Sequence, residues 1–235
     1  MTGQLWDIEG ADGSGKETQT RLLIDRLNQP GVLGGNKAHY WTFPTYEDPV
    51  WGKLIKEHLA DISKKADDYD PQYTALLYAA DRGKAAVKLQ PLIKAGDWII
   101  CDRYIASNMA FQGAKIKDEK KRDEFVSWLE DKEYNYFQIP KAAGTIYLSL
   151  PVEVSMARTE KRRQEAIEKG LALGDKIKKA DIYEQDREFL ERVRNEYLRL
   201  APLKGWHVIN CVQEGRELPR EEIAEKIWQI VSINP

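Results

Sequence analysis

Residues 5–19 read LWDIEGADGSGKETQ, and the predicted fold extends outward from this stretch. Its central part, residues 10–16, matches the phosphate-binding pattern G-x-x-x-x-G-K-[ST] up to the last position. An apolar run at residues 5–8 precedes the loop, and an amphipathic helical pattern over residues 18–28 follows it. The glycines let backbone N–H groups turn inward, and the helix points its positive end at the same anion. We therefore predict a site for a nucleotide triphosphate, formed by Gly10, Ala11, Asp12, Gly13, Ser14, Gly15, Lys16, Glu17 and Thr18.

Glu17 stands where the pattern has a Ser or Thr, whose hydroxyl normally contacts Mg²⁺, and Thr18 comes one position too late for that role. One interpretation is that the Glu17 carboxylate approaches Mg²⁺ directly or through water, because carboxylate oxygens suit this cation. The other is that Glu17 points away and stabilises the N-terminus of the helix through its charge. The sequence leaves both interpretations open.

The composition bounds the class of protein. The 235 residues, of which 42% are apolar, suit one α/β domain with a hydrophobic core. The net charge of −2 excludes a global basic field, so we expect no nucleic-acid partner. No apolar run reaches transmembrane length and no signal peptide precedes the first strand, so we expect a cytoplasmic protein without a membrane partner. Cys101 and Cys211 are expected to be buried thiols.

Strand patterns alternate with helical patterns along the chain. Strands are expected at residues 5–9, 39–43, 98–101, 144–150 and 206–210. Helices are expected at residues 18–28, 50–59, 72–95, 118–134, 152–163, 181–200 and 219–231, and after strand three as far as the Gln112-Gly113 break. The alternation predicts an α/β fold, a doubly wound parallel sheet of five strands flanked by helices, in a single domain over residues 1–235. Pro91 lies inside one helical pattern and is expected to kink or divide it.

Ligands bind at the carboxyl ends of the strands in such a sheet. Residues 10–16, 43–46, 102–107 and the segment after residue 150 each follow a strand and should therefore converge. Their charged groups are of the kind that phosphoryl transfer uses. Residues 158–179 are rich in Lys and Arg and contain glycines at 170 and 174. This basic stretch is either a segment that closes on the nucleotide or a solvated helix face.

Residues 102–107, DRYIAS, followed by AFQG at 110–113, resemble the thymidylate kinases. The family's other motifs occur in its order: EGADGSGK at 9–16, Phe43-Pro44, LYAADR at 77–82, a basic lid at about 158–182, and DIYE at 181–184. The resemblance covers nearly the whole chain and implies the three-layer P-loop kinase fold with a helical lid. It also implies an enzyme that phosphorylates dTMP to dTDP in dTTP biosynthesis, with ATP as the phosphoryl donor, Mg²⁺ as the cofactor, and a homodimeric assembly.

The resemblance implies a role for each matching residue. Lys16 would hold the ATP phosphates, Asp102 would organise Mg²⁺, and Arg158 would lie against the adenine. Arg103 would bind the acceptor phosphate, and Asp12 would lie between the phosphate loop and the acceptor sugar. The other acceptor contacts would come from Phe43, Pro44, Tyr78, Arg82, Ser107, Gln112 and Tyr183.

Within that set, Tyr78 would stack on the thymine ring, and Arg82, Ser107 and Gln112 would face the base. Tyr183 would crowd the sugar 2′ position and so favour deoxyribose. The residues alone leave open that Tyr78 belongs to the core, that Arg82 and Arg103 are surface ion-pair residues, and that Asp102 is a turn residue.

The chain departs from the family's pattern in ways that bear on the site. Many relatives place an arginine shortly after Phe-Pro to hold the acceptor phosphate, whereas this chain has Thr45-Tyr46, so the phosphate would depend more on Arg103. Position 13 is glycine rather than arginine, so a lid arginine is expected to stabilise the transferring phosphoryl group. The candidates for that role are Arg158, Arg162 and Arg163, and the candidate magnesium ligands are Glu17 and Asp102.

Two other functions remain open at this point. One is a kinase with another acceptor, such as dUMP, UMP, CMP or a deoxynucleoside, because pyrimidine recognition depends on side-chain positions. The other is an ATP-binding switch without an acceptor site. Such a switch would not need the polar and aromatic residues that the resemblance assigns to the acceptor: Tyr78, Arg82, Arg103, Ser107 and Gln112.

Overall fold

The computed structural model describes residues 3–61, 63–169, 182–183 and 186–233. Its centre is a parallel sheet of five strands in the order β2-β3-β1-β4-β5. The strands are β1 (Leu5–Gly10), β2 (Ala38–Thr42), β3 (Trp98–Asp102), β4 (Gly144–Ser149) and β5 (His207–Asn210). All five predicted strands are confirmed, each with bounds within one residue of the expected ones.

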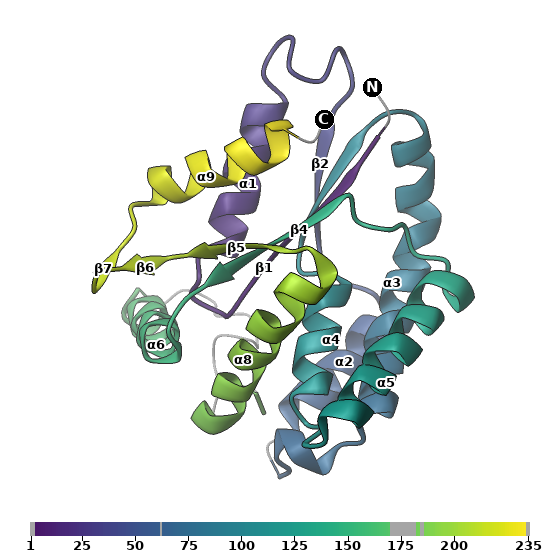
Figure 1. Ribbon diagram of the computed structural model, residues 1–235, viewed down its shortest axis with the longest axis vertical. Helices are drawn as coiled ribbons and strands as arrows, with labels where there is room; N and C mark the ends of the chain where they lie inside the picture. Colours follow the sequence, from purple (N-terminus) through teal and green to yellow (C-terminus); the bar gives the residue numbers. More distant parts are fainter. Residues whose placement is uncertain (1–2, 62, 170–181, 184–185, 234–235) are drawn as a thin grey trace.

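Helices cover both faces of the sheet, as the α/β alternation predicts (Figure 1). On one face lie α1 (Lys16–Leu27) and α9 (Arg220–Ile233), which also contact each other. On the other face lie α2 (Trp51–Ala60), α3 (Pro71–Lys94), α4 (Ile105–Gly113), α5 (Glu119–Glu130) and α8 (Arg187–Lys204), with the short turns η1 (Ala66–Asp68) and η2 (Asp131–Tyr136). The remaining helix, α6 (Val152–Glu168), follows β4 and lies beyond the carboxyl ends of the strands.

The central strand β1 is buried along its whole length, and its side chains alternate between two cores. Trp6 and Ile8 pack with α1 and α9 on one face, whereas Leu5 packs with α3 on the other. Asp7 and Glu9 share the face of Leu5 and are fully buried, so this face carries polar groups under α4 and α8. The alternation sets which residues of β1 can reach the site.

Several helices differ from the sequence-based bounds. The helix expected at residues 181–200 begins at Arg187, because the Asp186 side chain accepts a hydrogen bond from the N–H of Phe189 and caps it there. Gln112 and Gly113 do not break α4 but form its last turn. Pro91 does not divide α3, because it lies in the final turn and the helix ends only three residues later, at Lys94. Residues 170–181, with glycines 170 and 174 and Asp181, lie outside the described part of the chain, as does Glu184.

A small hairpin follows β5 and was not expected. Its strands are β6 (Val212–Gln213) and β7 (Arg216–Glu217), joined by Glu214 and Gly215, which both have positive φ angles of 51° and 76°. Two successive positive φ angles are typical of a tight hairpin turn, for which the Glu-Gly pair was the available signal. The hairpin matters because its residue Glu217 forms an ion pair with Arg158 of α6.

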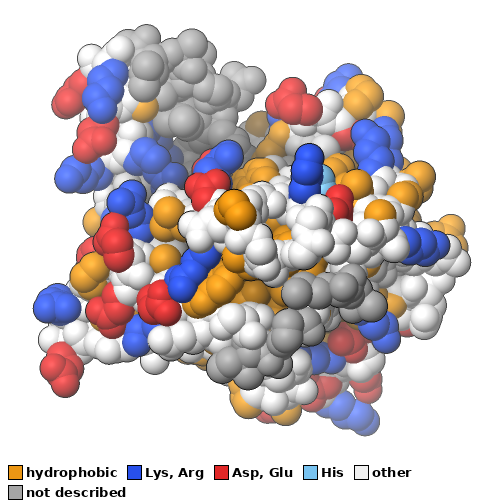
Figure 2. All heavy atoms as spheres, turned by 90° about the horizontal axis from the view of Figure 1, so that it is seen from above, with side chains coloured by type: hydrophobic (Ala, Val, Ile, Leu, Met, Phe, Trp, Pro, Cys, Tyr) orange, Lys and Arg blue, Asp and Glu red, His pale blue; other side chains and the backbone are white. Residues whose placement is uncertain are grey.

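The surface carries charges of both signs. Acidic and basic side chains are interspersed on the face shown in Figure 2, with hydrophobic side chains between them. Within the described residues, no helix combines the length and the apolar character that crossing a membrane requires. Cys101 and Cys211 are buried free thiols, as expected.

Candidate active site

The phosphate loop lies between β1 and α1, as the motif predicts. Gly13 and Gly15 have φ angles of 83° and 88°, a left-handed conformation that side chains with a Cβ rarely adopt. Gly15 precedes Lys16, the first residue of α1, so the open N-terminus of the helix faces the loop. Ser14 Oγ is buried without a hydrogen-bond partner among the described residues. The local backbone is therefore the concave donor-rich surface on which phosphate groups bind.

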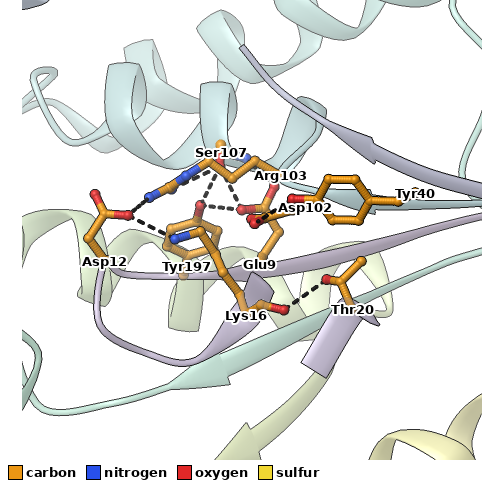
Figure 3. Close-up of polar contacts among 9 residues, drawn as sticks. All are labelled: Glu9, Asp12, Lys16, Thr20, Tyr40, Asp102, Arg103, Ser107 and Tyr197. Atoms are coloured by element: carbon orange, nitrogen blue, oxygen red, sulfur yellow. Dashed lines mark hydrogen bonds and ion pairs between the residues drawn. The ribbon is translucent and has the colours of Figure 1, made fainter. Parts of the chain in front are cut away.

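Asp12 joins two cations that arrive from different parts of the chain (Figure 3). Its Oδ1 atom lies 2.8 Å from Lys16 Nζ and 2.9 Å from Arg103 Nη2. Lys16 belongs to the phosphate loop, whereas Arg103 follows β3 and lies beside the cavity described below. The structure thus places the loop lysine and the arginine of the DRY motif at one point.

Arg103 is held by its surroundings rather than exposed to solvent. Its φ angle of 70° is left-handed, which costs a residue with a Cβ roughly 1–2 kcal/mol. Burial alone would lower the pKa of Arg103, but Asp12 and its other neighbours hold this pKa well above the usual value. The Arg103 side chain is only 15% exposed, although its ion-pair partner Asp12 is 46% exposed.

Asp102 ends β3 beside the loop lysine. Its side chain is only 6% exposed, and Tyr40 donates a hydrogen bond of 3.4 Å to Oδ2. Oδ1 is buried without a partner among the described residues. Burial raises the pKa of Asp102, while Lys16 and Arg103 oppose that rise. An orphaned carboxylate oxygen beside a phosphate loop is a suitable ligand for Mg²⁺ or for one of its water molecules.

A cavity of about 460 Å³ opens beside these groups, between α2, α3, α4 and the start of α6. Phe43, Pro44, Tyr78, Arg82, Arg103, Ser107, Gln112 and Tyr183 all line it, so every residue that the resemblance assigned to the acceptor is brought together. Asp12 lies at its edge toward the phosphate loop. Its volume falls within the range typical of small-ligand pockets.

Two buried amide groups from α4 line the cavity. Gln112 and Asn108 are 1% and 3% exposed, and the amide oxygen of each has no hydrogen-bond partner among the described residues. Arg82 is buried and bonds Glu133 through Nε at 2.9 and 3.1 Å, so it is not a surface residue. Unsatisfied buried acceptors cost free energy unless a ligand donates to them.

Two tyrosine side chains, Tyr78 and Tyr183, line the cavity. Tyr78 is half-buried, lines the cavity and also packs against a core cluster. Tyr183 is 5% exposed, stacks on Phe189 with ring centroids 5.4 Å apart, and lies 3.0 Å from His58 through its hydroxyl.

Comparison with known proteins identifies the family of the chain. The family model described as thymidylate kinase matches residues 8–223. The chain belongs to the thymidylate kinase family. It is therefore a kinase, and the reaction of its family is the ATP-dependent phosphorylation of dTMP; nothing in the comparisons favours another acceptor.

Relatives of this family match the chain over most of its length. A thymidylate kinase of Synechococcus sp. (strain CC9605) is 32% identical over 218 residues, which are 92% of each chain. A thymidylate kinase of Mycobacterium tuberculosis (strain H37Rv) is 30% identical over 200 residues, covering 85% of this chain and 86% of the relative. The solved structure of thymidylate kinase from Candida albicans superposes with a TM-score of 0.67 at 25% identity, covering 99% of this chain and 92% of that one.

Arg158, Arg162 and Arg163, which the sequence left as equal candidates for the transferring phosphoryl group, have different surroundings in the structure. Arg163 lines the cavity and pairs with Glu160 at 2.7 Å. Arg158 donates a hydrogen bond of 3.0 Å to the backbone oxygen of Gly13 and pairs with Glu217 of the β6–β7 hairpin. Arg162 is exposed on α6 and does not line the cavity.

Glu17 and Thr18 are both exposed on the first turn of α1. The Glu17 carboxylate lies 3.0 Å from Arg21 Nη2, one turn further along the same helix. This arrangement favours the interpretation in which Glu17 turns away from the metal and acts on the helix N-terminus. Among the described residues, no three His, Cys, Asp or Glu side chains are grouped as a metal site.

Sequence reasoning missed three residues that organise the site. Asn108 directly follows Ser107, and its position on the same helical turn was the available signal. Glu9 is part of the EGADGSGK motif, but only the fold shows that its carboxylate reaches α4 and α8. Glu133, the partner of Arg82, lies in η2 and had no signal in the sequence.

Proposed function

We propose that this chain transfers a phosphoryl group from ATP on the phosphate loop to dTMP in the cavity. The observation that carries the proposal is the shared contact of Asp12 with Lys16 and Arg103. A lysine that holds donor phosphates and an arginine that lines the acceptor cavity converge on one oxygen atom. Two phosphate groups bound to these cations would meet there, as transfer between them requires.

The pocket chemistry fits a thymine-like base. The orphaned amide oxygens of Asn108 and Gln112 accept hydrogen bonds, and thymine and uracil carry an N–H on the ring edge. Arg82 supplies donors for a carbonyl oxygen on the same edge. Tyr78 provides an aromatic surface for stacking. Tyr183, which lines the cavity, would face the sugar, in the role that the family resemblance gives it.

The reaction requires alignment and charge neutralisation rather than a strong base. A phosphate monoester is already an anionic nucleophile, so Lys16 and Arg103 serve by holding two repelling phosphates in line. Thr45 stands where many relatives have an arginine, and its N–H donates to Asp81, so the acceptor phosphate depends mainly on Arg103. Asp102 would hold Mg²⁺ or its water molecules, and Mg²⁺ would neutralise charge on the donor phosphates.

We propose Arg163 as the lid arginine that stabilises the transferring group, because it lines the cavity whereas Arg162 is exposed. Arg163→Met should lower kcat by about 100-fold with little change in ATP affinity, because a contact made mainly in the transition state is lost. Arg162→Met is the matched control on the same helix and should retain the wild-type kcat. Equal turnover of both variants would contradict the assignment.

The experiment that tests the function is ADP release in the presence of ATP and Mg²⁺, compared across acceptors. We expect strong turnover with dTMP, weaker turnover with dUMP, and background with UMP, CMP, dCMP, dGMP and thymidine. Preference for another nucleotide would reassign the base pocket. ADP release that ignores every acceptor would replace the kinase by an ATP-binding switch.

The assembly and location form part of the same proposal: a cytoplasmic homodimer of one kinase domain, residues 1–235, with a lid at about 158–182. Exposed apolar side chains on the contacting helices α2 and α3 support the dimer, since such patches mark interaction sites. They are Val50, Leu54, Tyr73, Leu76 and Val87, of which Val50 directly precedes α2.

A further inference from the structure

Glu9 is a buried carboxylate for which the chemistry above has no role. It lies near the end of β1 and is 0% exposed. Its Oε1 accepts hydrogen bonds from the N–H groups of Tyr104 at 2.9 Å and Ser107 at 2.8 Å. Its Oε2 accepts from the hydroxyls of Ser107 at 2.6 Å and Tyr197 at 2.8 Å (Figure 3). One carboxylate thus ties together β1, α4 and α8.

The two N–H groups belong to the N-terminus of α4. Tyr104 is the N-cap residue and Ser107 is the third residue of the helix, and the Tyr104 side chain does not cap it. These are the two N–H groups that a local capping box would satisfy. Glu9, which is 95 residues from Tyr104 in sequence, satisfies both and places a negative charge at the positive end of the helix.

Arg103 directly precedes this N-terminus and has the left-handed φ angle of 70°. A residue with a Cβ keeps this conformation only where its surroundings impose it. Because Glu9 holds residues 104 and 107, the backbone on the helix side of Arg103 cannot relax. The guanidinium then lies 2.9 Å from Asp12 and 3.4 Å from Ser107 Oγ, beside the cavity.

We infer that Glu9 is a positioning residue that fixes the direction of Arg103 and thereby sets how strongly the site holds the phosphate of its acceptor. The inference rests on the proposed function, in which Arg103 binds that phosphate. Tyr197 completes the arrangement. Its ring stacks on Tyr147 with centroids 4.3 Å apart and an interplanar angle of 6°, so its hydroxyl is held toward Glu9.

The test compares the affinities of dTMP and thymidine, because their ratio isolates the contribution of the phosphate group. Calorimetric titrations would use the wild-type protein, Glu9→Gln and Tyr197→Phe. An amide has one accepting oxygen, so Glu9→Gln sets an NH₂ group against two of the four donors. Tyr197→Phe removes one hydroxyl and keeps the stacked ring, so the test does not depend on the folding of Glu9→Gln.

We expect each variant to lower the ratio of dTMP to thymidine affinity by about tenfold, with the affinity for thymidine nearly unchanged. Tyr147→Phe is the control, since it keeps the stacked pair and all four hydrogen bonds of Glu9, and its ratio should equal that of the wild type. The inference would be overturned if Glu9→Gln and Tyr197→Phe left the ratio unchanged, or if they lowered the affinities for dTMP and thymidine by the same factor. A wild-type protein that binds dTMP no better than thymidine would instead overturn the proposed function.

Discussion

At the residue scale, Gly13 is where the phosphate loop meets α6. A Cβ at this position would lie 2.7 Å from the backbone oxygen of Ser155 and 3.2 Å from the Cβ of Arg158. Real Cβ atoms do not approach a backbone oxygen so closely, so the loop and α6 would have to separate. The glycine is therefore required by a close approach as well as by its left-handed backbone.

Gly13→Ala should accordingly destabilise the protein and weaken ATP binding. Gly31→Ala is a matched control, because Gly31 has a similar φ of 86° but open space around its Cβ position. We expect Gly31→Ala to cost about 1 kcal/mol of unfolding free energy through the backbone alone. Gly13→Ala should cost roughly 1–3 kcal/mol more, because of the clash. Urea denaturation measures both losses of unfolding free energy. Equal losses in the two variants would show that α6 moves aside without an energetic cost.

His58 gives the stability of the protein a pH dependence. Its side chain is 8% exposed, and burial, followed by the charge of Lys115, lowers the pKa of His58 from 6.5 to about 4. The folded state therefore keeps His58 neutral, while the unfolded chain takes up a proton below pH 6.5. The stabilisation is complete above that pH and is lost progressively as the pH falls toward about 4.

His58→Gln should remove this dependence. Between pH about 7.5 and about 5, the wild type should lose roughly 2 kcal/mol more unfolding free energy than the variant, because only the wild type carries this histidine. Urea denaturation across this pH range measures the difference. Parallel pH profiles for the two proteins would mean that His58 titrates normally in the folded state.

At the element scale, a buried ion pair links α3 to the neighbouring helical segments on its face of the sheet. Arg82 projects from α3 and Glu133 from η2, and their side chains are 3% and 0% exposed. Asn108 of α4 also donates to Glu133, at 3.1 Å. The pair therefore joins three helical segments, and its residue Arg82 lines the cavity. Removing one partner would leave an uncompensated buried charge.

Glu133→Leu and Arg82→Met should each lower the unfolding free energy by about 3–5 kcal/mol. The double variant should recover much of this loss, because two apolar side chains leave no charge buried. It should nevertheless bind dTMP poorly, since Arg82 is missing from the base pocket. A double variant less stable than either single variant would show that the ion pair itself, rather than the unpaired charge, determines the stability.

At the scale of the whole molecule, the exposed face of α2 and α3 is the proposed dimer contact. Tyr73, Leu76 and Val87 recur at helical spacing along α3, and Val87 is 74% exposed. Val87→Asp should shift sedimentation from dimer to monomer, because a charge would be buried in the interface. Tyr136→Asp is the control, since Tyr136 is equally exposed but lies on η2. Monomeric wild-type protein would refute the dimer.

The strands were predictable because each is short and bounded by loop residues, and the three central strands β1, β3 and β4 are buried on both faces, which leaves little ambiguity. The helix ends were less predictable. The start of α8 depends on which residue caps it, and Asp186 does so although the charged helical pattern begins earlier. The candidate site residues at the carboxyl end of a strand were predictable, as with Asp102 at the end of β3 and Arg103 directly after it, because the carboxyl ends of parallel strands lie at one edge of the sheet.

The phosphate loop, the parallel sheet and the family follow from the sequence alone, because each depends on local patterns: glycine spacing, apolar periodicity and short motifs. Which side chains meet follows only from the folded chain. The pairing of Arg82 with Glu133, the capping of α4 by Glu9 and the place of Arg163 in the cavity join residues from separate elements. Such contacts depend on how helices pack on the sheet, and burial gives them their strength.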